Sequence, residues 1–419
     1  MSPSKNPSPV RVLIAGGAYA GLTAAINLVD LGQGLQPRQA EEPYTHHPDL
    51  PTVDFEVTVV DERDGFFHLI GTPLALADAE YAKKPWLKFE DIPAAQHPNL
   101  KFIHGSVSSV DCAAKTATVL AHSIKEPTTH EYDYFVNAAG LRRVWPTVPQ
   151  ALTKEEYLRD CEAHIKSMEP ASHGVVVVGG GAVGIEMAAE LAVSKPEIKV
   201  TLVHSRDKLL SSEDLPDSIR DQTVELLKDA GVEVVLSHRL STVNEVQEAD
   251  GSKKYEVEFT NGDKRVTSKV INAISKSIPS TAFLPSSALD DEGYVKILPN
   301  LNFQPGTPNN ESHYCAGDAK QWSGIRRCGG ALMTGCMVAQ NIHQRVLQQR
   351  IGHEPKFLEI SPVPPMIALA VGKNAISTRP GFGTRSGPGV MERFFQDDLG
   401  FQIVWRIMSL GDRIPKQKI

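Results

Sequence analysis

Three observations predict an α/β fold with two Rossmann-like domains for this chain. Its 419 residues give room for two or three domains. A β-branched run over 10–15 is followed by a glycine-rich turn and an apolar helical pattern, in the order strand, tight turn, helix. The same order returns over 174–192, about 160 residues later. Each copy is typical of the start of a parallel sheet whose strands alternate with helices.

The first copy continues as strands separated by one long insertion. Residues 33–54 are rich in Pro, Gln and His and have no usable periodicity, so we expect a surface loop there. His46 and His47 lie in this insertion without an acidic or cysteine partner nearby, and we expect no metal site. Apolar periodicity predicts a helix over 22–31 and strands over 55–61, 101–107, 115–122 and 132–138.

The second copy predicts a further α/β unit. Its expected elements are strands over 174–178, 199–204 and 232–236, helices over 185–192 and 214–230, and a meander of strands over 240–246, 255–260 and 266–273. The rest of the chain predicts a strand that runs into a turn over 312–318, a long helix over 330–350 and a small separate module from Pro362 on.

Composition excludes several classes of protein. Hydrophobic residues make up 41% of the chain, and no apolar run approaches the ~18 residues of a membrane span. A net charge of -7 disfavours nucleic acid as the main partner. The five cysteines include no C-x-x-C pair, which indicates a reducing, cytoplasmic compartment. Residues 1–9 are expected to be a disordered lead without a secretory h-region, and Ser2 stands where N-myristoylation needs glycine.

The two glycine turns are candidate pyrophosphate sites. In a Gly-x-Gly-x-x-Gly turn, backbone N–H groups and the following helix N-terminus receive the phosphates, and the middle glycine allows close approach. Gly179, Gly181 and Gly184 complete this pattern, whereas the first copy has Ala18 in the middle position. One such turn is weak evidence, but two copies, each between an apolar strand and a helix, favour an enzyme that binds two dinucleotides.

The residue that ends the strand after each turn differs between the copies. Asp61 ends the strand over 55–61, where a carboxylate can hold a ribose hydroxyl. The corresponding position of the second copy is His204, followed by Ser205 and Arg206, with no carboxylate. A 2′-phosphate would not be repelled there, and Arg206 or Lys208 could pair with it, so NADPH is allowed or favoured. Arg206 facing solvent remains the alternative.

Three acidic residues are further candidates. Glu186 lies in the first turn of the second helix, with Glu190 one turn later on the same face. Glu186 either stabilises the helix N-terminus electrostatically or orients a nicotinamide against a flavin. Asp318 follows the strand over 312–318; it either binds a ribityl chain or pyrophosphate, or caps a helix.

Some chemistries lack their residues. There is no C-x-x-x-x-C pair, and Cys328 and Cys336 would be more than two turns apart on a helix, so a dithiol relay is not expected. Neither G-x-S-x-G nor H-E-x-x-H occurs, so hydrolase chemistry has no support.

The chain resembles the apoptosis-inducing-factor-like FAD oxidoreductases. The resemblance rests on the run from Val175 to Glu190 with 200–205, and on Asp61, Phe66, His68, Ala316-Gly317-Asp318 and the segment 398–408. Within that family it is most similar to the ferroptosis suppressor proteins and more distantly to the type II NADH dehydrogenases. The similarity covers nearly the whole chain from Val10, apart from the insertion over 33–54.

This resemblance implies an FAD-dependent NAD(P)H oxidoreductase with a quinone-like acceptor and a two-dinucleotide-binding fold. Glu186 matches the family's active-site glutamate. The implied domains are an FAD domain over 10–145 and 285–360, an NAD(P)H domain over 146–284 inserted into it, and a C-terminal module over 361–419. The implied FAD residues are Gly16, Gly17, Ala18, Tyr19, Ala20, Gly21, Asp61, His68, Val107, Ala139, Gly140 and Asp318, and the implied nucleotide residues are Gly179, Gly181, Gly184, His204 and Arg206.

Several departures from the family put the acceptor in question. Leu74 stands where the relatives have an arginine on FAD, and Gly329 stands where they have an aromatic residue. Phe395 and Gly400 replace a lysine and a phenylalanine of the C-terminal segment. Two alternatives therefore remain: a flavoprotein that acts on a specific biosynthetic intermediate, and a signalling protein that holds FAD without turnover.

The C-terminal segment carries a further alternative. Its aromatic residues precede Arg413, Lys416 and Lys418, which is a pattern that can sit on an anionic membrane surface. Asp397, Asp398 and Asp412 dilute this charge and favour packing of the aromatic residues over the flavin or at a homodimer interface. The aromatic and apolar side chains concerned are Phe394, Phe395, Phe401, Ile403, Trp405 and Ile407.

Overall fold

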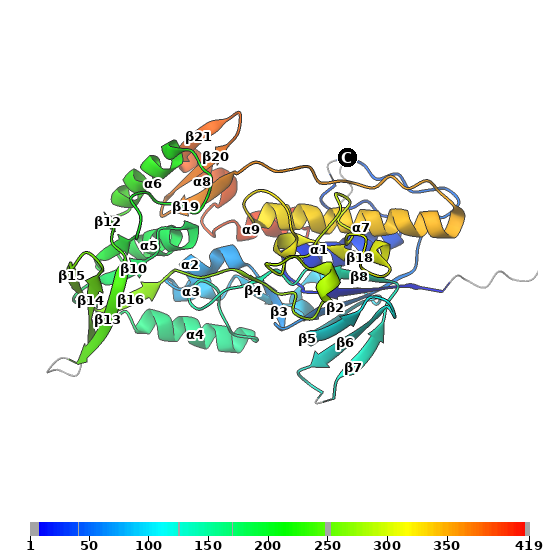
Figure 1. The fold of residues 1–419 in the computed structure, drawn as a ribbon, viewed down its shortest axis with the longest axis horizontal. Coiled ribbons are helices and arrows are strands. Elements are labelled where there is room, and N and C mark those ends of the chain that lie inside the picture. The colour runs from blue at the N-terminus through cyan, green and yellow to red at the C-terminus, as the bar shows by residue number, and fades with distance from the viewer. Residues whose placement is uncertain (1–7, 41, 125, 170, 248–252, 415–419) are drawn as a thin grey trace, which may run out of the picture.

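The computed structural model describes residues 8–40, 42–124, 126–169, 171–247 and 253–414, arranged around two sheets that lie side by side, one mixed and one wholly parallel (Figure 1). The first sheet has the order β18-β8-β1-β2-β5-β6-β7, in which β18 to β5 run parallel and β5 to β7 antiparallel. Its strands are β1 Val10–Ala15, β2 Phe55–Asp61, β5 Leu100–Asp111, β6 Thr116–Ala121, β7 Thr128–Glu131, β8 Tyr134–Asn137 and β18 His313–Cys315.

Two helices cross on the first sheet. Helix α1 (Tyr19–Gly32) is buried along its whole length, and α7 (Cys328–Ile351) packs against it (Figure 1). A Cβ at Gly335 of α7 would lie 2.3 Å from the carbonyl oxygen of Ala20, so the crossing requires glycine there. This close approach brings the end of the chain's last parallel strand, β18, to the beginning of α1.

The second sheet is smaller and wholly parallel, with the order β12-β11-β10-β16. An antiparallel sheet of the order β13-β14-β15 lies beside it. The elements of this unit are β10 Val175–Val178, α5 Ala182–Ser194, β11 Val200–Val203, α6 Asp217–Asp229, β12 Val232–Val235, β13 Leu240–Gln247, β14 Lys253–Phe259, β15 Lys264–Thr267 and β16 Lys269–Asn272.

Short elements connect the two sheets. The hydrophobic side chains between Phe67 and Trp86 pack into the core of the second sheet, although they belong to the chain of the first. Helix α4 joins the same core; it begins with a capping box between Thr153 and Glu156. These elements are β3 Gly65–Phe67, α2 Thr72–Ala75, α3 Ala79–Ala82, β4 Trp86–Lys88, β9 Leu141–Arg142, α4 Lys154–Lys166 and β17 Ile278–Pro279.

The C-terminal segment contacts both units. After α7 the chain runs back along that helix to the sheet β19-β20-β21, which lies against α5 and α6 (Figure 1). Helix α9 then returns to the first core, where Phe401, Val404 and Met408 are buried. The elements are β19 Ile367–Val371, β20 Asn374–Arg379, β21 Gly383–Gly387, α8 Pro388–Phe394 and α9 Phe401–Ile407.

Most of the expected elements are confirmed, and the differences have physical causes. The strand expected over 266–273 is wrong as a single element: β15 pairs with the meander and β16 with the parallel strand β10. Helix α4 was not expected. The domain limits at 145, 284 and 360 stay a prediction, since the two hydrophobic cores exchange segments across them.

The insertion over 33–54 is more than a surface loop. Arg38 is 6% exposed, and its guanidinium binds the carboxylate of Asp30 at 2.6 Å. It also donates to the carbonyl oxygens of Ser409 and Asp412. The expectation of a surface loop is therefore wrong for Arg38, which ties α1 to the end of the chain. The ring of His46 packs against Tyr44 and His343.

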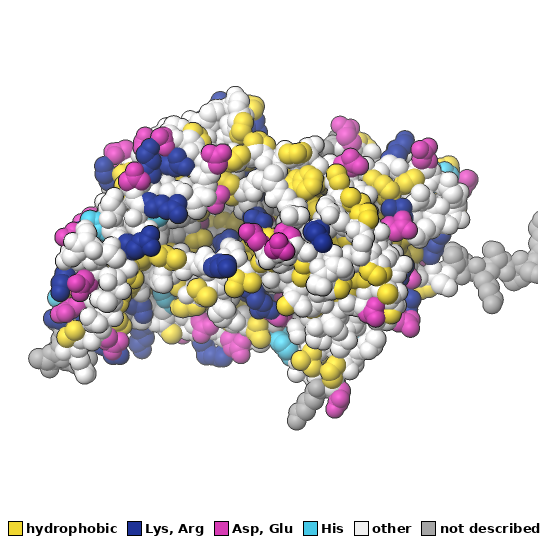
Figure 2. Space-filling model, viewed as in Figure 1, with side chains coloured by type: hydrophobic (Ala, Val, Ile, Leu, Met, Phe, Trp, Pro, Cys, Tyr) yellow, Lys and Arg dark blue, Asp and Glu magenta, His cyan; other side chains and the backbone are white. Residues whose placement is uncertain are grey.

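The aromatic residues of the C-terminal segment divide between core and surface. Phe395 and Phe401 are buried, whereas Phe394 and Ile407 are 41% and 44% exposed. Lys416 and Lys418 lie outside the described residues. Within the described part of the chain, no helix is both long and apolar enough to cross a membrane. Figure 2 shows basic and acidic side chains intermixed across one face of the molecule.

Candidate active site

The first glycine turn is closed by a backbone contact that only glycine permits. A Cβ at Gly21 would lie 1.7 Å from the carbonyl oxygen of Gly16. Gly16 itself has a φ of +99°, and a Cβ there would lie 2.5 Å from the carbonyl oxygen of Ala138. The turn therefore holds the start of α1 directly against the carboxyl end of β8.

The middle position of each turn shows why Ala18 is tolerated. Ala18 has a φ of −82° and Gly181 a φ of −81°, which is ordinary backbone for any residue. A Cβ at Gly181 would meet no atom within 4 Å, so the space over this turn is open. No side chain caps α1 or α5. Their first N–H groups are thus free for an anion, and both helix N-termini fit a pyrophosphate.

Asp61 holds the first turn from the end of β2. The N–H of Gly17 donates to its Oδ2 at 2.5 Å, and the N–H of Arg63 donates to its Oδ1 at 2.7 Å. Burial raises the pKa of Asp61, while the charge of Arg63 and the N–H of Gly17 act in the opposite direction. The carboxylate lies at the rim of the turn, where a ribose hydroxyl of a bound dinucleotide would meet it.

The remaining predicted residues of the first site come from neighbouring strand ends. Ala139 and Gly140 follow β8. A Cβ built on Gly16 would lie only 2.9 Å from the Cα of Ala139, so the first turn packs directly on this segment. Val107 is buried in β5, three residues beyond His104, which pairs with Asp61. These residues meet at the carboxyl edge of the parallel sheet, the edge at which open α/β sheets bind ligands.

Asp318 reaches the same place from β18. A Cβ at Gly317 would lie 3.2 Å from the Cβ of Ala20, and the N–H of Gly317 donates to Thr334 Oγ1 at 3.0 Å. Burial raises the pKa of Asp318, opposed by the charges of Lys320, Arg143 and Arg326. The structure thus brings the Ala-Gly-Asp motif, the first turn of α1 and the start of α7 together.

His68 does not present its side chain to this site. The imidazole is fully buried; Nδ1 accepts a hydrogen bond from the hydroxyl of Tyr19 (3.1 Å), and Nε2 donates to the carbonyl oxygen of Leu399 (3.0 Å). Burial lowers its pKa to about 4, so the ring is neutral. Through these two hydrogen bonds the imidazole links Tyr19 of α1 to the C-terminal segment, and the assignment of His68 to the cofactor site stays a prediction.

The second turn repeats the first with a different residue at the strand end. A Cβ at Gly184 would lie 1.9 Å from the carbonyl oxygen of Gly179. The N–H of Gly180 donates to Nδ1 of His204 at 3.1 Å, as that of Gly17 donates to Asp61. Nε2 of His204 then donates to Ser211 Oγ. Burial and the charge of Arg206 lower the pKa of His204, which favours the neutral ring.

Arg206 is exposed beside His204. Its guanidinium donates to the carbonyl oxygen of Ser211 at 2.7 Å and binds no described carboxylate. Lys208, by contrast, is ion-paired with Asp217 at 2.6 Å. Arg206 therefore has the freer charge of the two at this strand end.

Glu186 and Glu190 are buried on the same face of α5. The N–H of Ala370 in β19 lies 3.4 Å from Glu186 Oε1. Burial raises the pKa of Glu186 to about 8; the Ala370 N–H lowers it and the charge of Glu190 raises it further. Burial likewise raises the pKa of Glu190 to about 8. The C-terminal sheet thus covers a pair of carboxyl groups that can hold a proton at neutral pH.

Three basic residues of the site were not singled out in the sequence. Lys320, Arg326 and Arg327 line a hollow with Asp318 at the start of α7. Their signal was their position, in the short stretch between the Ala-Gly-Asp motif and the long helix. Gly329, where the family has an aromatic residue, leaves open space next to them, since a Cβ there would meet no atom within 4 Å.

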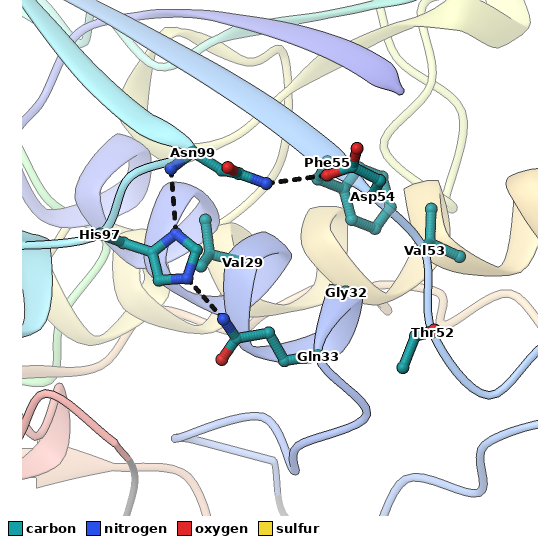
Figure 3. A pocket seen from close by; sticks show the side chains of 9 residues that line it. All are labelled: Val29, Gly32, Gln33, Thr52, Val53, Asp54, Phe55, His97 and Asn99. Carbon is teal, nitrogen blue, oxygen red and sulfur yellow. Dashed lines mark hydrogen bonds between the residues drawn. The ribbon is translucent and has the colours of Figure 1, made fainter. Parts of the chain in front are cut away.

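A second hollow, of about 390 Å³, lies away from both turns (Figure 3). It is lined by the end of α1 at Gly32 and Gln33 and by the start of β2 at Phe55, with His97 held between Gln33 and the N–H of Asn99 (Figure 3). The carboxyl end of a helix repels anions. The opposite ends of the same elements carry the glycine turn, so phosphates are expected there.

Comparison with known proteins agrees with this geometry. A family model described as pyridine nucleotide-disulphide oxidoreductase matches residues 10–335. An Ajellomyces capsulatus protein, oxidoreductase OXR1, is 48% identical over 421 residues, which cover 98% of this chain and 90% of the relative. This chain belongs to the pyridine nucleotide-disulphide oxidoreductase family. The prediction that this protein is an oxidoreductase is thereby confirmed.

Two further comparisons confirm the resemblance and the fold. Ferroptosis suppressor protein 1 of Xenopus tropicalis is 27% identical to this oxidoreductase over 315 residues, or 74% of each chain. The solved structure of NDH2 from Plasmodium falciparum in complex with NADH has a TM-score of 0.66 at 12% identity, and covers 96% of this chain and 98% of that one. Although the family name includes a disulphide, the five cysteines of this oxidoreductase, all among the described residues, form no disulfide with one another.

Proposed function

We propose that this oxidoreductase binds FAD at the first turn and NADH or NADPH at the second, and transfers electrons from the nicotinamide through the flavin to a quinone-like acceptor. One observation carries the proposal. Two glycine turns each begin a helix that no side chain caps, and a buried carboxyl group, Glu186, is the fifth residue of the second helix, α5. This is the arrangement that two dinucleotides and a hydride transfer require.

The residues of the first turn would hold FAD. The free N–H groups at the start of α1 receive the pyrophosphate, Asp61 accepts from a ribose hydroxyl, and Asp318 faces the ribityl chain. Ala139, Gly140 and Val107 surround this edge of the sheet. Bound there, FAD supplies the redox chemistry, which is the acceptance of a hydride from NAD(P)H and the release of two electrons to an acceptor.

The second turn would position the nicotinamide nucleotide. Gly179, Gly181 and Gly184 leave the start of α5 open to a pyrophosphate, and His204 and Arg206 lie where the adenosine ribose would sit. Glu186 lies two residues beyond Gly184, the last glycine of the turn, and would orient the nicotinamide. Because its pKa is raised to about 8, Glu186 also holds a proton near the reaction at neutral pH.

The overall reaction is balanced by one proton from solvent. NAD(P)H, one proton and the oxidised quinone give NAD(P)⁺ and the quinol, with two electrons transferred. The acceptor class rests on the resemblance to the ferroptosis suppressor proteins, which implies a quinone-like acceptor, and one such protein is among the relatives of this chain.

An anaerobic titration tests the proposal. Purified protein is mixed with NADPH or NADH while flavin absorption is followed, and a soluble quinone is then added. We expect rapid bleaching, followed by reoxidation with quinone. A protein without flavin, or one whose flavin is not bleached, would refute the proposal. Bleaching without reoxidation by quinone would instead favour an enzyme specific for a biosynthetic intermediate.

Glu186 distinguishes turnover from a signalling role. A protein that holds FAD only structurally would bind NAD(P)H without steady turnover, and Glu186→Ala would then change nothing measurable. We expect Glu186→Ala to lower the rate of flavin bleaching strongly while FAD content stays normal. Glu225→Ala, on the exposed face of α6, is the matched control.

A further inference from the structure

The hollow at the start of α7 has an unusual charge for this protein. It lies between the Ala-Gly-Asp turn and the first residues of α7. Lys320, Arg326 and Arg327 line it together with a single carboxylate, Asp318. Arg143, from the segment after β8, adds a fourth positive charge near Asp318. Around this hollow positive charge thus exceeds negative charge, although the whole chain has a net charge of -7.

None of these four cations is neutralised by an ion pair. No carboxylate oxygen in the described part of the chain lies within 4.0 Å of their nitrogen atoms. Lys320 Nζ donates to the carbonyl oxygen of Gly317 (2.9 Å), Arg326 Nε to that of Asp318 (3.0 Å), and Arg143 Nε to Ser277 Oγ (2.9 Å). These partners are neutral, and Arg326 lies over the ring of Tyr294 at 4.2 Å. The positive charge is held in place without being cancelled.

Arg327 is the cation best placed to meet a ligand. It directly precedes the first residue of α7, and no hydrogen bond of its side chain is found among the described residues. Arg327 is exposed to solvent, and partial desolvation of its guanidinium lowers its pKa with no carboxylate acting in the opposite direction. The first turn of α7 contains no acidic residue, so the helix dipole adds to the same positive potential.

The hollow adjoins the proposed flavin site and also has an apolar part. Asp318 and Thr334 line it, and Thr334 binds the N–H of Gly317, which packs on Ala20 of the first turn. Trp322, Met333 and Ile360 form its apolar side. These walls offer apolar contact to a ring and positive charge to an acidic group.

From this geometry we infer that the hollow is the acceptor site, and that the acceptor is a quinone-like ring bearing a carboxylate, sulfonate or phosphate that Arg327 binds. The inference rests on the proposed function, because it requires a flavin at the first turn. It narrows the acceptor from quinones in general to acidic ones. The electron balance is unchanged: two electrons and two protons convert the acidic quinone into its quinol.

Two quinones with the same ring test this inference on the FAD-loaded enzyme. The probes are 1,2-naphthoquinone-4-sulfonate and neutral 1,2-naphthoquinone, and the readout is kcat/KM for each. We expect the wild type to prefer the sulfonate. Arg327→Gln should lower kcat/KM for the sulfonate about tenfold, the effect of losing one charge-assisted hydrogen bond, and leave that for the neutral quinone within about twofold. Arg327→Lys should restore part of the loss.

The controls distinguish three outcomes that would overturn the inference: no preference for the acidic quinone, a role of Arg327 in FAD binding, and failure of the proposed function itself. Arg239→Gln removes an exposed arginine of the second unit and should change neither value. Equal use of both quinones by the wild type, or an equal effect of Arg327→Gln on both, would overturn the inference and leave the proposed function standing. A loss of FAD content in Arg327→Gln would assign the cations to FAD and also overturn it. If neither quinone reoxidised the wild-type flavin, the proposed function itself would fail, and the inference with it.

Discussion

The two glycine turns have the same backbone and differ in the chemistry at their rims. In each, the last glycine packs on the carbonyl oxygen of the first, at a distance that excludes a Cβ. In each, the second N–H of the turn donates to the residue that ends the next strand. That residue is a carboxylate, Asp61, in one turn and an imidazole, His204, in the other. The backbone contact is thus needed to form the turn, whereas the strand-end residue is free to set which nucleotide it prefers.

The helices that follow the two turns also differ in their buried carboxyl groups. Helix α1 has a buried carboxylate, Asp30, which is paired with Arg38 at 2.6 Å. Helix α5 has Glu186 and Glu190, for which no described cation forms an ion pair, and Glu190 Oε1 has no hydrogen-bond partner. A paired acid stabilises a helix, whereas an unpaired acid with a raised pKa stores a proton. This contrast is consistent with the proposed roles, in which the first turn holds FAD and the second binds NAD(P)H.

The largest expected effect separates the two kinds of glycine within one turn. Gly184→Ala places a Cβ where the carbonyl oxygen of Gly179 lies, so the start of α5 must move and its N–H groups lose the pyrophosphate. We expect NAD(P)H-driven bleaching to slow on the order of 100-fold, with FAD still bound. Gly181→Ala enters open space at a φ of −81° and should change the rate by less than about threefold. Stopped-flow absorption measures both, and equal losses would contradict the comparison.

A smaller effect is expected when the carboxylate of the first turn is removed. Asp61→Ala takes away the acceptor of the Gly17 N–H and of the proposed ribose hydroxyl. We expect the Kd for FAD to rise roughly 10- to 100-fold, the value of a hydrogen bond to a charged group. His204→Ala removes the matching acceptor of the second turn and should leave the Kd for FAD unchanged. Titration of the FAD-free protein by flavin fluorescence tests both variants.

Exchanging the strand-end chemistry should change the preferred nucleotide. His204→Asp gives the second turn the carboxylate of the first, which repels a 2′-phosphate and accepts from a 2′-hydroxyl. We expect the ratio of kcat/KM for NADPH to that for NADH to fall about tenfold. Arg206→Gln should lower the same ratio without improving NADH. If neither variant changed the ratio of kcat/KM for NADPH to that for NADH, then His204 and Arg206 would not determine whether the enzyme binds a 2′-phosphate or a 2′-hydroxyl.

The smallest expected effect concerns the unpaired acid of α5. Burial raises the pKa of Glu190 from 4.5 to about 8, so the unfolded chain releases this proton at lower pH than the folded one. Stability from this group is full below pH 4.5 and falls by about 1.4 kcal/mol per pH unit as the pH rises towards 8. Glu190→Gln should therefore reduce the drop in Tm between about pH 5 and pH 8 by a few degrees. Glu225→Gln, an exposed residue of α6, should leave the drop as it is.

Local sequence patterns predict those elements of the molecule that depend on neighbouring residues rather than on contacts between distant parts of the chain. The bounds of β1 and β2 follow from their β-branched runs, and the two turns follow from the glycines that come directly after β1 and β10. The capping box formed by Thr153 and Glu156 is a local sequence signal for the start of α4, although apolar periodicity did not predict this helix. The split between β15 and β16 could not be predicted, because strand pairing with β10 across almost a hundred residues decides it.

The candidate site divides in the same way. Asp61 ends a strand, Asp318 follows one, and Glu186 lies in the helix after a glycine turn, so their positions could be predicted from the sequence. The hydrogen bonds of the His68 side chain could not be predicted, because its partners Tyr19 and Leu399 come from distant parts of the chain. The excess of positive charge at the start of α7 was also hidden, because it depends on which carboxylates are absent nearby in space.

The way the C-terminal segment fills the first core has a consequence for synthesis on the ribosome. The second parallel sheet is made of one continuous stretch, from Val175 to Asn272, and can form as soon as that stretch has emerged. The first sheet waits for β18, and its core waits further for α7 and for Phe401 and Met408. The core of the second sheet needs the chain only as far as Ile376, so the half that begins the chain is the last to have its core completed.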